Sequence, residues 1–237
     1  MDKALQLESR FSLPPNSLGY CGKKTAAYKF KQCIINGKCD GVKKEVTGFI
    51  VLYPYLKLLN KITKQPKFSK QTIEGYWLGN EILNKAKPKD YLLLLGYFQK
   101  QGVPGFFIKE LKEKMPKKFI PSHLFQVLHV GVGRASGSVP FNLETVNDCM
   151  IRWGKVQSVT KNTATVDLNS LKTKNGRTYE LTLAKTKVPF DRQLVLGLKK
   201  GDTVAVHWKM IIKILNDDEV KNIGFWTKEV LKLKFPA

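Results

Sequence analysis

The stretch "NDCMIRWGKV", residues 147–156, marks a change in the pattern of the chain. Within it Cys149 stands five positions before Gly154, and Gly-Lys-Val opens a run in which apolar and polar residues alternate. Such alternation is typical of a half-buried β-strand, whereas the apolar residues before it recur at the spacing of helices. The stretch therefore predicts a helical part and a β part of the chain, with a thiol where they meet.

Five segments upstream carry apolar residues on one helical face, and we expect each to form a helix. They are 53–62, 73–86, 87–102, 105–115 and 121–130. Asp90 and Ser122 stand where N-terminal caps are expected, because their side-chain oxygens can accept hydrogen bonds from the first free backbone amides. Five helices so close together predict a helical bundle.

The two ends of this helical region are predicted to lack regular structure. Residues 1–48 contain the turn-rich "LPPNSLGYCG" (13–22), and we expect them to be irregular. The Gly/Ser-rich segment 131–142 is expected to be a connection. We therefore divide the chain into a mainly helical domain, 1–140, and a second domain, 141–237.

The second domain has the pattern of a small β structure closed by a helix. Four segments alternate or are rich in β-branched residues, and we expect them to be short strands. They are 155–159, 163–168, 178–184 and 202–208. Short strands divided by turns predict a small, OB-like β-barrel. Segment 216–233 is acidic at its start and opens with a capping Asn or Asp, so it is expected to be a closing helix. The fold class expected for the whole chain is α+β.

The formal charge of +22 points to an anionic partner, nucleic acid above all. Only five of the 41 basic residues are arginine, however, and arginine makes the bidentate contacts that read phosphates and bases. The lysines are also scattered, so we favour a solvated, lysine-rich surface over a nucleic-acid site. In an alternative that stays open, aromatic residues of the barrel stack on single-stranded nucleic acid. These aromatic residues are Trp153, Tyr179, Phe190 and Trp208.

The number and spacing of the cysteines help to predict the cellular compartment of the protein and whether it binds structural zinc. They are Cys21, Cys33, Cys39 and Cys149, and none forms a C-x-x-C pair of the kind that binds structural zinc. The N-terminus has no apolar signal region, and no stretch reaches the ~20 apolar residues of a membrane span. We therefore expect a cytoplasmic protein without membrane contact, in which all four thiols are reduced.

The β part, about residues 148–237, resembles the HypC/HupF family of nickel–iron hydrogenase maturation chaperones. That family opens with a cysteine followed, five positions on, by the glycine of a Gly-Lys-Val turn, as Cys149 and Gly154 do here. An Ala-x-Val-Asp strand, a Gly-Asp-x-Val-x-Val-His segment and an acidic final helix follow in the same order. Their matches are Ala164, Val166 and Asp167; Gly201, Asp202, Val204, Val206 and His207; and residues 216–223. Trp153 replaces the family's proline, Lys209 replaces a glycine, and Cys149 is internal rather than beside the α-amino group.

The resemblance implies a non-enzymatic role in assembling a metal centre. The cargo would be iron, carried transiently as an iron-cyanide-carbonyl unit, and the partner a hydrogenase large-subunit precursor or another maturation protein. A thiolate is a strong ligand for such iron, so Cys149 would be the ligand. His207 would complete the coordination or lower the pKa of the thiol. We therefore expect the sulfur of Cys149 and the imidazole of His207 to lie within roughly 10 Å.

The whole chain also resembles an uncharacterised prokaryotic family in which such a domain follows a helical one. A short connection keeps the two domains close, so the helices should help surround Cys149. His129 and Cys21 are the best candidates to face it, and His123, Trp153 and Trp208 are further candidates for the interface. His123 and His129 are six residues apart, so they are not an i, i+4 metal pair. Two other functions stay open, a basic OB-like nucleic-acid-binding protein and an enzyme centred on Cys149.

Overall fold

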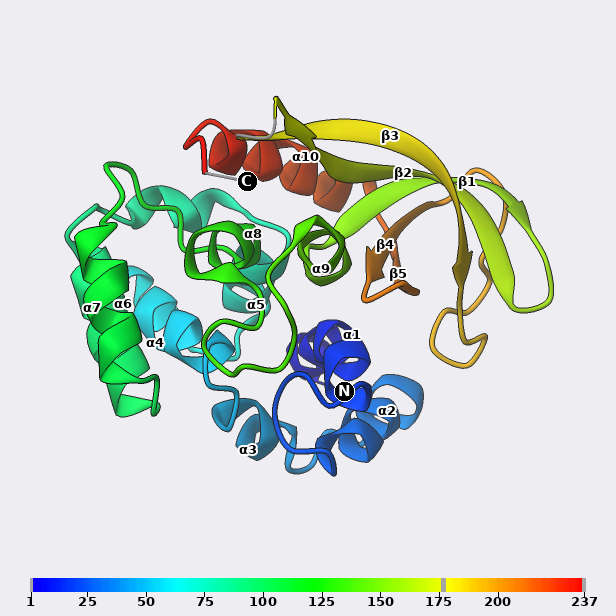
Figure 1. Ribbon diagram of the computed structural model, residues 1–237. Helices are drawn as coiled ribbons and strands as arrows, with labels where there is room; N and C mark the ends of the chain where they lie inside the picture. The colour runs from blue at the N-terminus through cyan, green and yellow to red at the C-terminus, as the bar shows by residue number, and fades with distance from the viewer. Residues whose placement is uncertain (1, 176–177, 236–237) are drawn as a thin grey trace.

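The computed structural model describes residues 2–175 and 178–235 as helices arranged around one antiparallel sheet (Figure 1). The helical elements are α1 (Lys3–Ser17), α2 (Ala26–Asn36), α3 (Val42–Thr47), α4 (Leu52–Thr63), α5 (Lys70–Trp77), the 3-10 helix η1 (Glu81–Lys85), α6 (Asp90–Lys100), α7 (Gly105–Glu113), α8 (His123–Phe125), the π-helical turn η2 (Gln126–Gly131), α9 (Leu143–Cys149) and α10 (Asp217–Leu231). The strands are β1 (Arg152–Val159), β2 (Thr163–Lys174), β3 (Thr178–Pro189), β4 (Thr203–His207) and β5 (Met210–Leu215). The expected α+β class is confirmed.

The expectation of an irregular N-terminal segment is wrong, because residues 1–48 contain three helices. Helix α1 begins after Asp2, whose side chain accepts a hydrogen bond from the amide of Leu5 at 3.0 Å. It continues through Pro14 and Pro15, the two residues that suggested a turn. The helix buries much of its surface, including the fully buried Phe11, and this burial outweighs the low helix propensity of proline.

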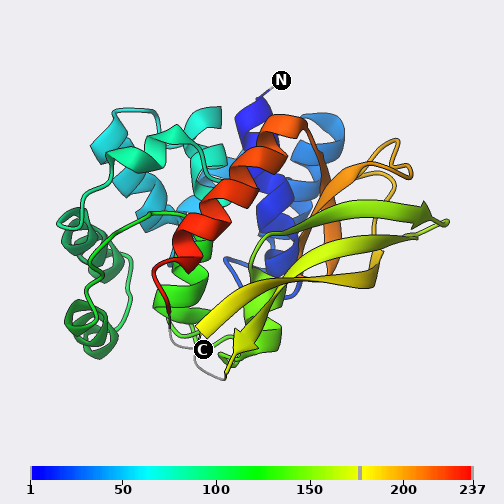
Figure 2. The ribbon, with the colours of Figure 1, turned by 90° about the horizontal axis from the view of Figure 1, so that it is seen from above.

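The five strands form an open sheet in the order β3-β2-β1-β4-β5, with every neighbouring pair antiparallel. The expected closed, OB-like barrel is therefore not formed, since β3 and β5 are the two edges of the sheet. The end of β2 and the start of β3 lie beside α10, and the opposite end of this long strand pair reaches away from the helices, while α1 packs against β4 and β5 (Figures 1 and 2). Because α1 packs on β4 and β5 and α9 packs on β2, helices bury apolar surface that a closed barrel would bury in its interior.

The sequence analysis did not predict strand β5, because the turn before it has no typical turn residues. Trp208 and Lys209 link β4 to β5, and both have positive φ, 47° and 61°. A two-residue hairpin turn with two positive φ angles usually carries Asn-Gly or another glycine pair. A tryptophan followed by a lysine gives no such indication, so the hairpin was not predicted.

Gly154 of the Cys-x4-Gly-Lys-Val motif lies where β1 meets β2. A Cβ atom at this position would lie 2.1 Å from the carbonyl oxygen of Asp167 on the neighbouring strand. No real Cβ approaches an oxygen so closely, so only glycine allows the two backbones to pair here.

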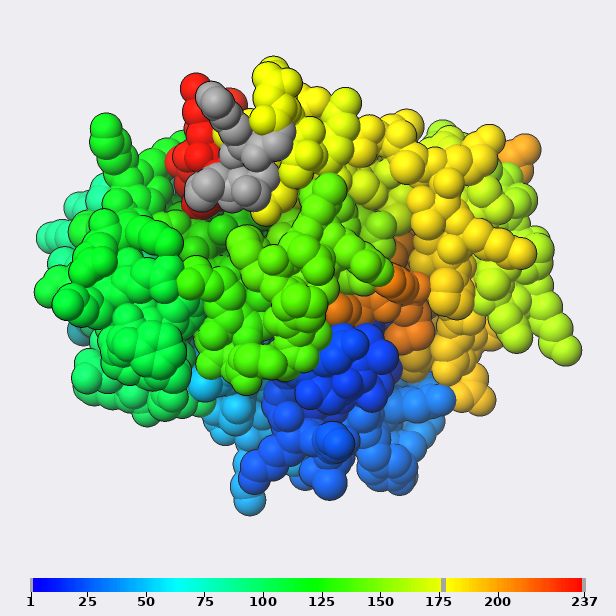
Figure 3. Space-filling view, in the orientation of Figure 1, coloured from blue at the N-terminus to red at the C-terminus, as the bar shows by residue number. Residues whose placement is uncertain are grey.

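The boundary predicted near residue 140 falls in the turns between η2 and α9. One continuous cluster of buried apolar side chains nevertheless runs through both parts of the chain. Arg10 of α1 also donates a hydrogen bond to the carbonyl of Ile212 in β5 at 3.2 Å. The helical part and the sheet therefore share their core, and the space-filling surface is continuous between them (Figure 3).

The prediction of four reduced thiols is wrong for two of them, because Cys33 and Cys39 form a disulfide. Helix α2 ends at Gly37, whose φ of +67° reverses the chain. The reversal brings the Cα atoms of the two cysteines to 4.3 Å. Cys21 and Cys149 are free.

Among the described residues there is no helix with both the length and the apolar character needed to cross a bilayer.

Candidate metal centre

Three side chains from distant parts of the sequence meet between the helices and the sheet. They are His123 at the start of α8, Cys149 at the end of α9 and His207 at the end of β4, and we call them the His–Cys–His cluster. Their ligand atoms all lie within 4.8 Å of one another, and all three residues are buried. The ligand atoms of a tetrahedral site lie about 3.3–3.8 Å apart, so a contraction of about 1 Å would accommodate an ion.

Local sequence features place the two helical members. Ser122 caps α8 by accepting a hydrogen bond from the amide of Phe125 at 3.4 Å, as its position predicted. Helix α9 begins with a capping box formed by Asn142 and Thr145, which the sequence patterns did not single out. Cys149 is the last residue of this short helix, just before β1 begins.

The imidazole of His207 is held with one nitrogen free. Its Nδ1 atom lies 2.8 Å from the carbonyl oxygen of Phe11, so Nδ1 carries the proton and donates it. Nε2 is then an unprotonated acceptor, and it is buried without a hydrogen-bond partner among the described residues. A histidine that donates one N–H to a backbone carbonyl and keeps the other nitrogen free is in the usual state of a metal ligand.

His123 is held by a hydrogen bond at each nitrogen. Its Nε2 lies 2.8 Å from the carbonyl oxygen of Cys149, which only accepts, so Nε2–H is the donor. Its Nδ1 then accepts from the hydroxyl of Tyr76 at 3.1 Å. The sulfur of Cys149 lies 3.9 Å from the same Nε2 atom. Coordination through Nε2 requires the other tautomer, in which Nδ1–H donates to the oxygen of Tyr76.

Burial keeps all three groups of the cluster uncharged in the absence of an ion. It lowers the pKa of His123 to about 4 and that of His207 well below its usual value. It also raises the pKa of the Cys149 thiol well above its usual value. His207 can bind a cation through its free Nε2 and His123 can do so after its change of tautomer, whereas the thiol must first lose its proton. A protonated, buried thiol is a poor nucleophile, so the cluster without an ion does not resemble an activated cysteine enzyme.

A cavity of about 420 Å³ adjoins the cluster, and all three members of the cluster line it. We call it the metal cavity. Its other walls include Cys21 and Trp208, and residues of the 131–142 connection. The indole Nε1 of Trp208 is buried and has no partner among the described residues. Two polar atoms without partners among the described residues, this one and Nε2 of His207, therefore belong to residues that line one cavity, so this cavity is suited to a polar ligand.

Of the residues that the sequence placed near Cys149, some lie there and others do not. The expected proximity of Cys149 and His207 is confirmed. Cys21 is half-buried on the cavity wall, whereas the prediction for His129 is wrong, because its Nε2 bonds to the hydroxyl of Tyr91 at 2.8 Å. His123 occupies the place expected for His129. Nothing in the helical pattern distinguishes the two, because the choice depends on how α8 packs against α9.

Trp153 does not line the metal cavity. It is buried in β1, where its carbonyl accepts a hydrogen bond from Asn169 at 2.9 Å. The other aromatic residues considered for base stacking, Tyr179, Phe190 and Trp208, are also less than a tenth exposed. The sheet therefore offers no exposed row of these aromatic side chains to single-stranded nucleic acid.

The sequence analysis missed a buried acid behind the cluster. Glu8 is fully buried, and its Oε2 accepts a hydrogen bond from Nε1 of Trp77 at 2.9 Å. The ring of Trp77 lies against those of His123 and His207, with centroids 4.4 and 5.6 Å apart. Burial raises the pKa of Glu8 to about 7. The sequence around Glu8 does not indicate that its side chain is buried, so only the packing of the folded chain identifies Glu8 as a buried acid.

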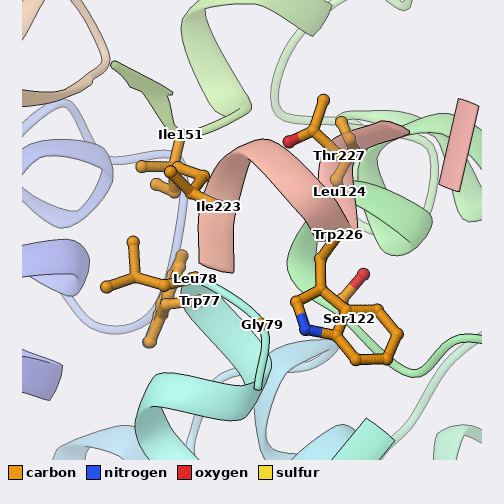
Figure 4. A pocket seen from close by; sticks show the side chains of 9 residues that line it. All are labelled: Trp77, Leu78, Gly79, Ser122, Leu124, Ile151, Ile223, Trp226 and Thr227. Carbon is orange, nitrogen blue, oxygen red and sulfur yellow. The ribbon is translucent and has the colours of Figure 1, made fainter. Parts of the chain in front are cut away.

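Trp77 also borders a second, much smaller pocket (Figure 4). Ile151, Ile223 and Trp226 form part of its lining, and its volume is about 20 Å³. This space holds about one water molecule, so it is a packing defect beside α10 rather than a ligand site.

The fold and the cluster together define an α+β protein with a candidate metal centre between its helices and its sheet. The chain belongs to DUF6390, a family of unknown function whose model matches residues 2–235. No curated protein and no solved structure matches the chain.

Proposed function

We propose that this protein binds a transition-metal ion through His123, Cys149 and His207 and serves as an accessory protein in the assembly of a metal centre. The observation that carries the proposal is the His–Cys–His cluster, whose ligand atoms lie within 4.8 Å of one another and in which Nε2 of His207 is buried without a partner among the described residues. A buried acceptor of this kind is costly unless something binds it. A cation would offset the cost and would also stabilise the thiolate.

The donor set narrows the choice of ion. One thiolate and two imidazoles suit iron, nickel, copper and zinc, and they do not suit calcium or magnesium, which prefer oxygen. Three protein ligands leave at least one coordination position for a group that arrives with the ion. The adjoining metal cavity has room for such a group.

Iron delivery in nickel–iron hydrogenase maturation is the specific pathway that we propose. It depends on the resemblance of residues 148–237 to HypC/HupF chaperones, in which Cys149 and His207 match the family's cysteine and histidine. An incompletely saturated site suits a carrier, because the recipient can displace its ligands one at a time. In this chain His123 takes the place beside the cysteine where the family has its free α-amino group.

Anaerobic metal titration tests the proposal directly. We expect the full chain to bind one Fe(II) ion, with a sulfur-to-metal absorption band, and the variants His123→Gln, Cys149→Ser and His207→Gln to bind at least tenfold more weakly. His129→Gln is the matched control, because His129 belongs neither to the cluster nor to the lining of the metal cavity, and this variant should bind iron normally. Binding that survives Cys149→Ser and His207→Gln would refute the assignment. Parallel titrations with Zn(II) and Ni(II) show whether iron is preferred.

A further inference from the structure

A second hollow, of about 650 Å³, lies between the helical part and the C-terminal segment. Three stretches of chain form it: the one after α7, η2 with the connection that follows, and the one after α10. The C-terminal segment, red in Figure 3, lies against the green segments of the helical part. We call this hollow the basic groove. Its volume lies within the 300–1,000 Å³ or so that small-molecule sites occupy.

Positive charge dominates the basic groove. Six of the residues that line it are basic: Lys114, Lys117, Lys118, Arg134, Lys232 and Lys234. Two carboxylates hold four of these cations in place. Glu110 pairs with Lys114 at 2.7 Å and with Arg134 at 2.8 Å, and Glu229 pairs with Lys118 and Lys232.

The six basic side chains of the groove exceed the two carboxylates by four positive charges. Lys117 and Lys234 have no carboxylate within 4.0 Å in the part of the chain that the structure describes, and both are exposed. Exposed lysines that are not paired within the described part of the chain attract a polyanion, and each can donate several hydrogen bonds to phosphate oxygens.

Apart from His129, which bonds to the hydroxyl of Tyr91, the rest of the lining is apolar. Leu128 and Phe235 of this lining are buried, and Leu233 is half-buried. Phe141 is 39% exposed, so a face of its ring is available to a ligand. The basic groove thus offers an aromatic surface and a ring of cations within the space of one small molecule.

We infer that the basic groove binds a nucleoside triphosphate, with its phosphates among the lysines and its base against Phe141. The count of charges favours a polyphosphate over a fatty acid, since a single carboxylate would leave most of the excess unpaired. The volume favours a small molecule over a nucleic-acid strand or a protein segment. The inference does not depend on the proposed metal function, since none of these residues belongs to the His–Cys–His cluster.

The basic groove and the metal cavity nevertheless share one wall. Gly131 at the end of η2 lines both, and the connection 131–142 contributes residues to each. A ligand in the basic groove would therefore contact the same segment that borders the metal cavity.

The test is calorimetric titration of the full chain with ATP, with inorganic triphosphate and with adenosine, at about 50 mM salt. We expect ATP to bind more tightly than either fragment. The double variant Lys117→Glu/Lys234→Glu should weaken ATP binding at least tenfold, and Phe141→Ala should weaken ATP binding but leave triphosphate binding unchanged. The matched control is Lys61→Glu/Lys89→Glu, which reverses two exposed lysines outside the groove and should bind ATP with little change.

Three outcomes would overturn the inference: no ATP binding, equal losses in the groove and control variants, or equal affinity for ATP and triphosphate with no effect of Phe141→Ala. The last would reduce the groove to a general attraction for anions. Melting curves of each variant confirm that the exposed substitutions leave the fold intact. Iron titration of the same variants keeps this result separate from the metal assignment, because Lys117→Glu/Lys234→Glu should load iron normally.

Discussion

Nδ1 of His207 donates a hydrogen bond to the carbonyl of Phe11 at 2.8 Å, across 196 positions of the sequence. The last residue of β4 is thereby oriented by the first helix of the chain. Because His123 also comes from the helical part, the His–Cys–His cluster exists only where that part and the sheet meet. The interface between the two parts of the chain therefore determines the geometry of the candidate metal centre.

Tyr76 should control how strongly His123 binds an ion. Its hydroxyl is the only partner of Nδ1 of His123 among the described residues, and Nδ1–H must donate to it once Nε2 coordinates. We expect Tyr76→Phe to weaken metal binding by about 10–100-fold, as the loss of such supporting hydrogen bonds does elsewhere.

Tyr55→Phe is the matched control for this experiment. Tyr55 is equally buried and its ring lies 5.4 Å from that of Tyr76, but its hydroxyl has no partner among the described residues. It should bind metal normally. Equal affinities of the two variants, measured by competition with a chromogenic chelator, would show that His123 does not coordinate through Nε2.

Metal binding should release one proton, and that proton should come from Cys149. Burial raises the pKa of this thiol well above its usual value, so the thiol is protonated before the ion arrives. His123, with a pKa lowered to about 4, has no second proton to lose. Calorimetry in two buffers at pH 8.5, above the pKa of Glu8, should give one proton per ion. Release of no proton would mean that the sulfur is not a ligand, and Cys149→Ser should abolish the release.

Glu8 should make the stability of the protein depend on pH in a specific direction. Burial raises its pKa from 4.5 to about 7, so between these values the folded chain holds a proton that the unfolded chain has lost. The contribution of Glu8 to stability is therefore complete below pH 4.5 and is lost as the pH rises through 7. The loss amounts to about 3 kcal/mol.

Glu8→Gln isolates this effect, because glutamine retains groups that can bond to Ser12 and Trp77. The stability of the wild-type chain relative to the variant should fall by about 3 kcal/mol between pH 4.5 and 8. Urea unfolding at several pH values measures it. The histidines oppose the trend in both proteins, because their lowered pKa values destabilise the fold as the pH falls below 6.5. A difference that stays constant with pH would contradict the assignment.

Because Cys33 and Cys39 form a disulfide, we expect a fixed number of reactive thiols before and after reduction. Under denaturing conditions without a reductant, two thiols, Cys21 and Cys149, should react with a thiol reagent, and after reduction four should react. The variant Cys33→Ser/Cys39→Ser should lose about 2–3 kcal/mol of stability, the range expected for a short closed loop. Four reactive thiols before reduction would show that the bridge does not form.

Sequence patterns correctly predicted the helix caps and strands that depend on residues close together in the chain. Asn216 and Ser122 cap α10 and α8 as expected, and the alternating segments after Cys149 became strands. The patterns failed where distant packing decides. Helix α1 tolerates Pro14 because of the core that it covers, and the turn at Trp208 adopts a conformation that its residues do not favour. For the same reason the sequence could place Cys149 beside His207 but could not select His123.

The glycine of the Cys-x4-Gly-Lys-Val motif has a consequence for how relatives of this protein should be recognised. Gly154 is required by the backbone of Asp167, whatever the chain binds. A motif search that scores this glycine therefore selects proteins with the same strand crossing, whether or not they keep the residues of the His–Cys–His cluster. Whether a relative retains the proposed metal centre should be judged from the residue that aligns with His123, which lies outside the motif, more than twenty positions before Cys149.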